Sequence, residues 1–158
     1  MQIKSINRWL TLGANIGVVI GIVFLIIEIN QNTVSTRIAA RNSATQGHID
    51  YIGHLLDSSI LASAAAKTWT NQELSHLETT QLIIFHEIRW RHYEAVFYLY
   101  QNSVISDQEW TGYESGITQS FQEDEVFWKI SRDSWDNTKA KLSEDFVAYV
   151  EGLVANLR

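Results

Sequence analysis

The sequence contains no cysteine and no proline. Without cysteine there is no disulfide, no thiolate nucleophile and no cysteine-ligated metal. Without proline the strongest helix breaker is missing, and only eight glycines occur in the 158 residues. We therefore expect long uninterrupted helices. The chain beyond residue 30 is long enough for one compact domain but not for two ordinary ones.

Positive charge is also scarce. The net charge is −6, from 18 Asp and Glu against 12 Lys and Arg. Residues 107–158 hold eleven acidic and five basic side chains, and this difference equals the whole net charge. Nucleic acids and anionic lipids are bound by clustered cations. The composition thus argues against nucleic acid as a partner and favours a solvated acidic surface.

Residues 9–27 form a long run without a charged side chain, WLTLGANIGVVIGIVFLII. A helix of this length covers roughly 28 Å, which is about the thickness of the hydrocarbon core of a bilayer. A cleaved signal peptide and a buried helix of a soluble protein are the alternatives. A signal peptide has a shorter apolar region and a small-x-small cleavage site, which is missing here. We predict a tail at 1–8, a transmembrane anchor at 9–29 and a helical stalk and bundle domain at 30–158.

One side of the predicted anchor carries small residues. Gly13, Gly17 and Gly21 recur every four residues, and Phe24 continues their side of the helix. Glycine at this spacing lets a second transmembrane helix approach closely. We expect the strip to pack on another membrane helix, either a second copy of this chain or a different membrane protein.

Polar residues follow the glycine strip at the expected membrane boundary, namely Glu28, Gln31 and Asn32. An oligomer would gather several Glu28 carboxylates, which raise one another's pKa and could bind a cation. The simpler interpretation is that Glu28 ends the apolar run and reaches water.

The orientation of the predicted anchor in the membrane is decided by a difference of one positive charge between its two ends. Lys4, Arg8 and the amino terminus precede the anchor, whereas Arg37 and Arg41 follow it. This bias favours a cytoplasmic N-terminus and so a periplasmic domain.

The fold class predicted for the remainder is all-α, a stalk helix followed by a small antiparallel bundle. Residues 31–57 keep apolar side chains at helical spacing, and a short helix follows at 60–69. Thr70 and Glu73 have capping-box spacing and predict the start of a helix over 72–102, and Ser106 with Glu109 predicts the next start. A last helix is expected to start at Ser143. The apolar positions of the stalk are Val34, Ile38, Thr45, Ile49, Ile52 and Leu56.

The 72–102 helix carries two apolar stripes, so we expect it to be covered on two sides inside the bundle. One stripe is Leu74, Leu77, Ile84, Ile88, Ala95 and Leu99; the other, largely aromatic, is Ile83, His86, Trp90, Tyr93, Phe97 and Tyr100.

No catalytic grouping is predicted. His86-Glu87 begins like a zinc-protease motif, but Trp90 stands where the second ligand belongs. Glu73 and His76 have the spacing of half a di-iron site, and no second Glu-x-x-His exists. We therefore expect no metal and no cofactor. The candidate ligand-lining residues are His86, Trp90, His92, Tyr93 and Phe97, although an aromatic stripe of this kind is more often core than pocket.

The end of the anchor, Glu28-Ile29-Asn30-Gln31-Asn32-Thr33, resembles that of a recurring type of small bacterial single-pass membrane protein. In that type a Gly-rich helix ends in Glu- or Gln-Ile-x-Gln-Asn-Thr. The likeness covers about the first 40 residues. It implies a bacterial inner-membrane protein and assigns no catalytic residue.

These observations predict a non-enzymatic membrane protein: a scaffold, accessory subunit or sensor that acts through helix–helix and protein–protein contacts. The alternative is a membrane-tethered domain that binds a small ligand or metal through the aromatic stripe.

Overall fold

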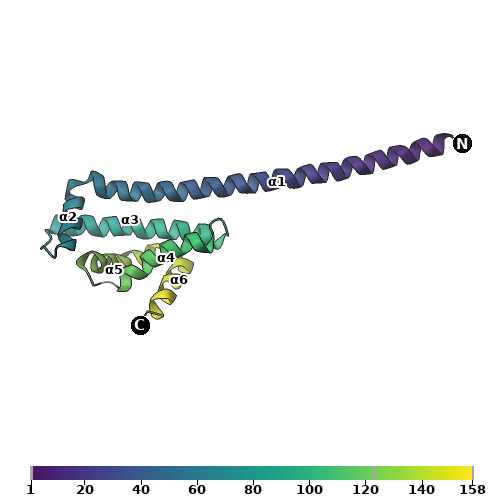
Figure 1. Ribbon diagram of the computed structural model, residues 1–158. Helices are drawn as coiled ribbons and strands as arrows, with labels where there is room; N and C mark the ends of the chain where they lie inside the picture. Colours follow the sequence, from purple (N-terminus) through teal and green to yellow (C-terminus); the bar gives the residue numbers. More distant parts are fainter. Residues whose placement is uncertain (1, 123, 158) are drawn as a thin grey trace. The chain divides into compact units, whose positions relative to one another are not determined.

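The computed structural model describes residues 2–122 and 124–157; positions 1, 123 and 158 lie outside the described residues. Throughout the described part the regular structure is helical, as predicted (Figure 1). The helices are α1 (Gln2–Asp57), α2 (Ser59–Trp69), α3 (His76–Gln101), α4 (Asp107–Gln122), α5 (Val126–Thr138), the 3₁₀ turn η1 (Lys139–Lys141) and α6 (Glu144–Ala155).

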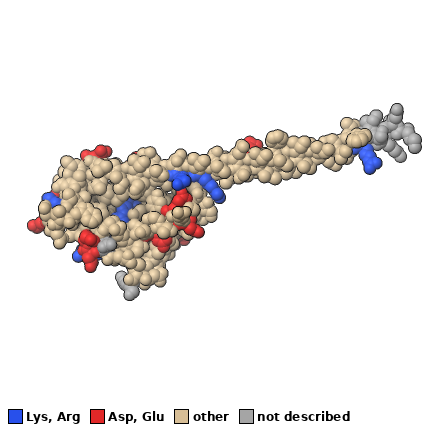
Figure 2. All heavy atoms as spheres, in the orientation of Figure 1, with Lys and Arg blue, Asp and Glu red and all other residues tan. Residues whose placement is uncertain are grey.

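The chain divides into two units, residues 1–39 and residues 40–158. In the first unit every side chain from residue 8 to residue 39 is exposed. Figure 2 shows a long stretch of this helix without a charged side chain. By length and composition α1 is a candidate membrane span, a criterion that a signal sequence also satisfies. The predicted tail at 1–8 is helical from Gln2 onward, where α1 begins.

In the second unit, the boundary between α2 and α3 differs from the prediction. Thr70 does not open a helix; its N–H donates to Ala66 O, and it ends α2. Ser75 opens α3 instead, in a capping box with Glu78. Both S/T-x-x-E matches occur in the sequence, and the second prevails because Glu78 also binds Lys67 of α2 at 2.8 Å. The predicted 72–102 helix therefore starts at His76.

The predicted start of α4 is confirmed. Ser106 N donates to Glu109 Oε2 at 2.9 Å, and Glu109 N donates to Ser106 Oγ at 3.3 Å. The two bonds satisfy N–H groups that lack a partner within the helix.

The second unit has two hydrophobic clusters, and α3 contributes to both. The buried residues of the first are Trp90, Tyr93, Val96, Phe97, Ile105, Trp110, Ile117, Trp135, Phe146 and Val150. Those of the second are Tyr51, Leu61, Ala64, Ala65, Leu82, Phe85, Phe127 and Ile130. Each large side chain buried in this way stabilises the fold by roughly 1.5–3 kcal/mol.

The end of α1 uses a face that the sequence analysis did not select. Tyr51 stacks on Phe85 of α3 with ring centroids 4.4 Å apart. A Cβ at Gly47 would lie 3.1 Å from His92 Nδ1, so the absence of a side chain permits this approach. The predicted stripe of the stalk lies on another side of the helix and is exposed at Thr45, Ile49, Ile52 and Leu56.

Most of one of the two predicted stripes of α3 also stays on the surface, although its end residues Leu74 and Leu99 are half-buried. Leu77, Ile84 and Ile88 are exposed, whereas the aromatic stripe is covered by the neighbouring helices. The expectation that both stripes are covered is therefore wrong for this chain alone. The covered face is the aromatic stripe widened by Leu82 and Val96, because the large rings occupy the space between helices.

Candidate functional site

The residues predicted for membrane helix packing are open in the isolated chain. A Cβ at Gly13, Gly17 or Gly21 would meet nothing within 4 Å. Phe24 is exposed, and so are the boundary residues Glu28, Gln31 and Asn32. Helix packing through this strip stays a prediction.

The predicted ligand-lining residues all lie on α3, and most belong to the interior. His86, Trp90, Tyr93 and Phe97 are buried, and His92 is half-buried. Trp90 Nε1 donates to the carbonyl of Ser131 on α5 at 3.1 Å, which satisfies the one donor of the indole. Contact of these residues with a ligand stays a prediction.

A buried arginine lies among these residues, and the sequence analysis did not select it. This residue is Arg89, of which only 3% is exposed. A signal was present, because Arg89 stands four residues after Phe85 and four before Tyr93, on the covered face of α3. Arginine is mostly exposed in proteins, so the residue type by itself gives no reason to place Arg89 in the interior.

The guanidinium of Arg89 joins three helices. Nε donates to Tyr93 Oη at 3.0 Å on its own helix. Nη2 donates to the Gly116 carbonyl at 2.8 Å and to Ser120 Oγ at 2.6 Å, both on α4. Nη1 lies 3.5 Å from Ser131 Oγ of α5. The fixed fork of the guanidinium thus fits acceptors from α3, α4 and α5 at once.

The acceptors around Arg89 are neutral. Among the described residues no carboxylate forms an ion pair with it. Its charge lies instead against aromatic faces, with Cζ 4.8 Å from the Trp128 ring centroid and 5.1 Å from that of Tyr93. Such cation–π contacts stabilise a desolvated guanidinium by about 2 kcal/mol. The Arg89 guanidinium is therefore a buried cation held by hydroxyl groups, a backbone carbonyl and aromatic rings. We call it, with these partners, the Arg89 centre.

The titratable neighbours of Arg89 are held neutral. Burial, followed by the charge of Arg89, lowers the pKa of His86 to about 3. Burial also raises the pKa of Tyr51 above its ordinary value, which the Arg89 charge partly opposes. A neutral imidazole beside a fully hydrogen-bonded cation offers no nucleophile–base pair. The centre is suited to holding helices together.

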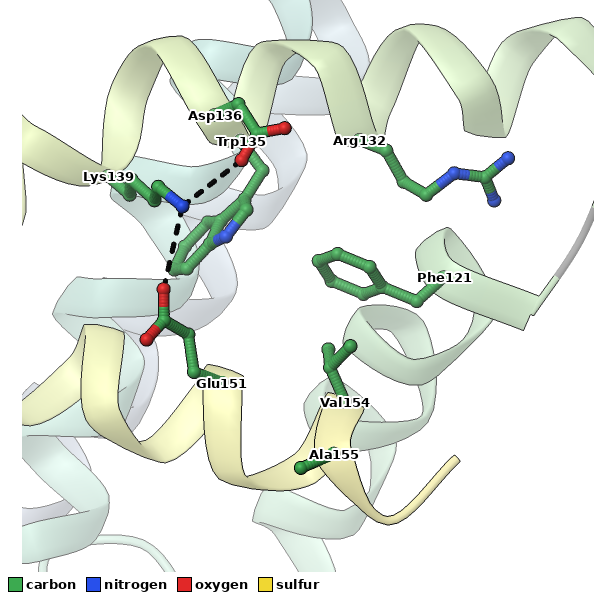
Figure 3. Close-up of a pocket in the computed structure, with 8 residues that line it drawn as sticks. All are labelled: Phe121, Arg132, Trp135, Asp136, Lys139, Glu151, Val154 and Ala155. Carbon is green, nitrogen blue, oxygen red and sulfur yellow. Dashed lines mark ion pairs between the residues drawn. The ribbon is translucent and has the colours of Figure 1, made fainter. Parts of the chain in front are cut away.

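A surface groove lies elsewhere, between α4, α5 and α6 (Figure 3). Its volume is about 390 Å³. Phe121, Trp135 and Val154 form its apolar walls, and Arg132 extends from α5 at one end. Arg132 Nη1 donates to the Ser120 carbonyl at 3.1 Å, so Arg132 of the groove and Arg89 bind the same serine.

The opposite end of the groove carries a small ion-pair network. Lys139 Nζ lies 3.2 Å from Asp136 Oδ1 and 3.5 Å from Glu151 Oε1 (Figure 3). The hydrogen bond from Lys139 to Asp136, supported by Glu151, raises the pKa of the lysine. The groove therefore combines aromatic walls with charges of both signs.

The described residues contain no group of three or more His, Cys, Asp or Glu side chains placed to hold a metal ion. Comparisons of the chain with protein-family models, with curated proteins and with solved structures found no match. The function is therefore inferred from the chain's own residues.

Proposed function

We propose that this protein is a membrane-anchored interaction module, a scaffold, accessory subunit or sensor that works through helix–helix and protein–protein contacts. In this proposal residues 9–29 span a bacterial inner membrane and the domain is periplasmic. Support for the span comes from a charge-free run of bilayer length whose side chains are exposed.

The observation that carries the proposal is the exposure of apolar side chains on two helices of residues 40–158. Ile49 is 55% exposed and Leu56 is 73% exposed on α1. On α3, Leu77 and Ile84 are 55% and 53% exposed, and they stand seven residues apart on one face. Aligned exposed apolar residues are typical of interaction surfaces, whereas scattered ones are not.

The proposal includes an antiparallel bundle for the domain. Contacts between α1 and α3 support it, because residues that ascend along α1 meet residues that descend along α3. Gly47 lies beside His92, and Tyr51 stacks on Phe85. The helix α2 and residues 70–75 connect the two helices.

The experiment is purification of the tagged full-length chain in mild detergent, with the α3 face altered. The parent is expected to copurify with a stoichiometric protein, either another copy or a different chain. Leu77→Glu/Ile84→Glu places charges on the exposed face of α3 and is expected to weaken capture of a partner bound there. Gln119→Glu, at an exposed position of α4, is the control. A parent chain that purifies alone, as a single copy, contradicts the proposal.

A second function, binding of a small ligand, is favoured by the groove between α4, α5 and α6. Its aromatic walls and paired charges are typical of sites for small molecules that carry an apolar body and a polar group. A thermal-shift screen of metals and metabolites tests it. A ligand shift that Phe121→Leu abolishes supports this function, since Phe121 lines the groove and is only partly buried, and no shift from any compound counts against it.

A further inference from the structure

We propose that the exposed apolar face of α1 in residues 42–56 binds the same face of a second copy of this chain, in parallel. We call this face the α1 seam. It consists of Asn42, Thr45, Ile49, Ile52 and Leu56, all exposed. The inference rests on the proposed function and deepens it by naming the partner and the residues.

The spacing along the α1 seam is the first observation. The steps between successive residues are 3, 4, 3 and 4, which is the heptad repeat of two helices that wrap around each other. Ile49 and Leu56 then take a positions, with Ile52 at the d position between them. A helix that packs on a globular core shows a broader apolar stripe. The heptad spacing therefore indicates a second helix as the occupant.

The second observation is that the seam is separate from the face that α1 uses within its own domain. Ala44, Gly47, His48, Tyr51 and Leu55 contact or approach the rest of the domain, and Arg41 binds it beside the seam. At 3.6 residues per turn, the centres of the two faces lie roughly 110° apart around the helix. A second copy can approach the seam without displacing the stacking of Tyr51 on Phe85.

Charge is the third observation. None of the five seam residues is charged, so two identical faces meet without repulsion at the core positions. Arg41, next to the seam, binds Glu109 of its own domain at 3.0 Å. Asp50 accepts a hydrogen bond from Gln46 at 2.8 Å away from the seam.

Asn42 identifies a second copy, in parallel, as the occupant. An asparagine at an a position pairs with the same residue of a parallel partner helix and fixes register and a two-stranded state. Two copies anchored in one membrane leave it on the same side, which favours the parallel arrangement. Two heptads are short for an independent coiled coil. Anchoring in a shared membrane raises the effective concentration and offsets this shortness.

The absence of cysteine provides a direct test, because every introduced cysteine is unique. Ile49→Cys and Ile52→Cys are placed in the seam, and Asp50→Cys on an exposed position away from it serves as the matched control. In the full-length chain in native membranes, oxidation is expected to yield several-fold more disulfide-linked dimer from the two seam variants. Equal crosslinking at position 50, or no dimer at positions 49 and 52, overturns the inference.

A charge variant supplies a readout that does not depend on crosslinking. Ile49→Glu/Ile52→Glu is expected to convert the dimer in mild detergent to a single copy, as measured by light scattering. Ser43→Glu/His54→Glu adds two charges at exposed positions away from the seam and is expected to leave the dimer intact. Unchanged far-UV circular dichroism shows that both variants fold.

The outcomes also separate this inference from the proposed function. A dimer that survives the Ile49→Glu/Ile52→Glu change overturns the seam and leaves the proposed function standing. A parent chain that is a single copy bound to a different protein also overturns the seam and leaves the proposed function standing. A single copy without any partner overturns both.

Discussion

Arg89 Nη2 lies 2.6 Å from Ser120 Oγ, and this hydrogen bond joins the buried faces of α3 and α4. The guanidinium and the hydroxyl are both buried, so neither exchanges this partner for water. Hydrogen bonds to charged groups in such surroundings are stronger than those between neutral groups. The pair thus makes an interior cation a structural element of the domain.

Arg89→Lys is expected to lower the free energy of unfolding by about 2–4 kcal/mol, because a point-like ammonium leaves buried acceptors on α4 and α5 unpaired. Chemical denaturation followed by near-UV circular dichroism measures the loss. Arg91→Lys is the matched control, since Arg91 is an exposed arginine on the same helix. It is expected to change stability by about 0.5 kcal/mol or less. Equal losses for the two variants would contradict the assignment of Arg89 as a buried centre.

Gly116→Ala is expected to destabilise the domain by about 1–3 kcal/mol. Its Cβ would lie 2.5 Å from Tyr93 Oη, the atom that accepts from Arg89 Nε. Gly112→Ala, one turn earlier on α4, meets nothing within 4 Å and is expected to be neutral or stabilising by up to about 1 kcal/mol. Thermal unfolding of the two variants gives the comparison. Tyr93→Phe removes the clashing hydroxyl together with the acceptor of Arg89 Nε, so Gly116→Ala is expected to cost less in the Tyr93→Phe background than in the parent.

The buried imidazole of His86 predicts an acid-dependent loss of stability. Its pKa is about 3 in the folded chain against 6.5 for the free side chain, so only the unfolded chain takes up a proton between these values. The stabilisation is complete above pH 6.5 and falls by up to about 1.4 kcal/mol per pH unit as the pH drops toward 3. His86→Gln should flatten this part of the curve of unfolding free energy against pH. His76→Gln changes an exposed histidine of α3, and its curve should run parallel to that of the parent.

The lowered pKa of Glu78 predicts a second loss of stability, at lower pH than the loss caused by His86. Hydrogen bonds from Lys67 and from Ser75 lower the pKa of Glu78 to about 2 from 4.5. The folded carboxylate is therefore favoured above pH 4.5, and this contribution is lost as the pH falls from 4.5 toward 2. Glu78→Gln should remove the dependence in this window and lower stability at pH 7. A parent and variant whose stabilities differ by the same amount at pH 7 and pH 2.5 would refute this role.

Gly17→Leu tests the glycine strip of the predicted anchor. A leucine side chain prevents the close approach that glycine permits between membrane helices. The oligomer in mild detergent is therefore expected to dissociate to smaller species, as measured by light scattering. Val18→Leu, at the next position and off the strip, is the control. An oligomer of unchanged size in Gly17→Leu would remove the strip from the interface.

Local signals predicted the fold class and several helix boundaries. The lack of proline and the capping pair Ser106 and Glu109 act within one or a few helical turns. They can therefore be recognised without knowing which other helices pack nearby. The pair Thr70 and Glu73 has the same spacing and did not form. The difference lies in Lys67, which reaches Glu78 from α2 and stabilises the competing box at Ser75.

The candidate site depended on contacts that spacing does not encode. Arg89 belongs to a face shared with Leu82 and Val96, yet its burial requires acceptors from α4 and α5 that stand 27 and 42 residues away along the chain. The predicted ligand-lining residues share that face, and the neighbouring helices cover most of them.

The sequence by itself determined the helical class and a charge-free segment of bilayer length, because backbone propensity, breakers and hydropathy are properties of short stretches. Only the tertiary structure decided which stripes of α1 and α3 are covered. Small residues such as Gly47 allow α1 to lie close to α3, so the larger apolar residues Ile49 and Leu56 remain on the outside. Close packing between helices selected the face that fits, and the side of α1 that carries Ile49 and Leu56 stays exposed.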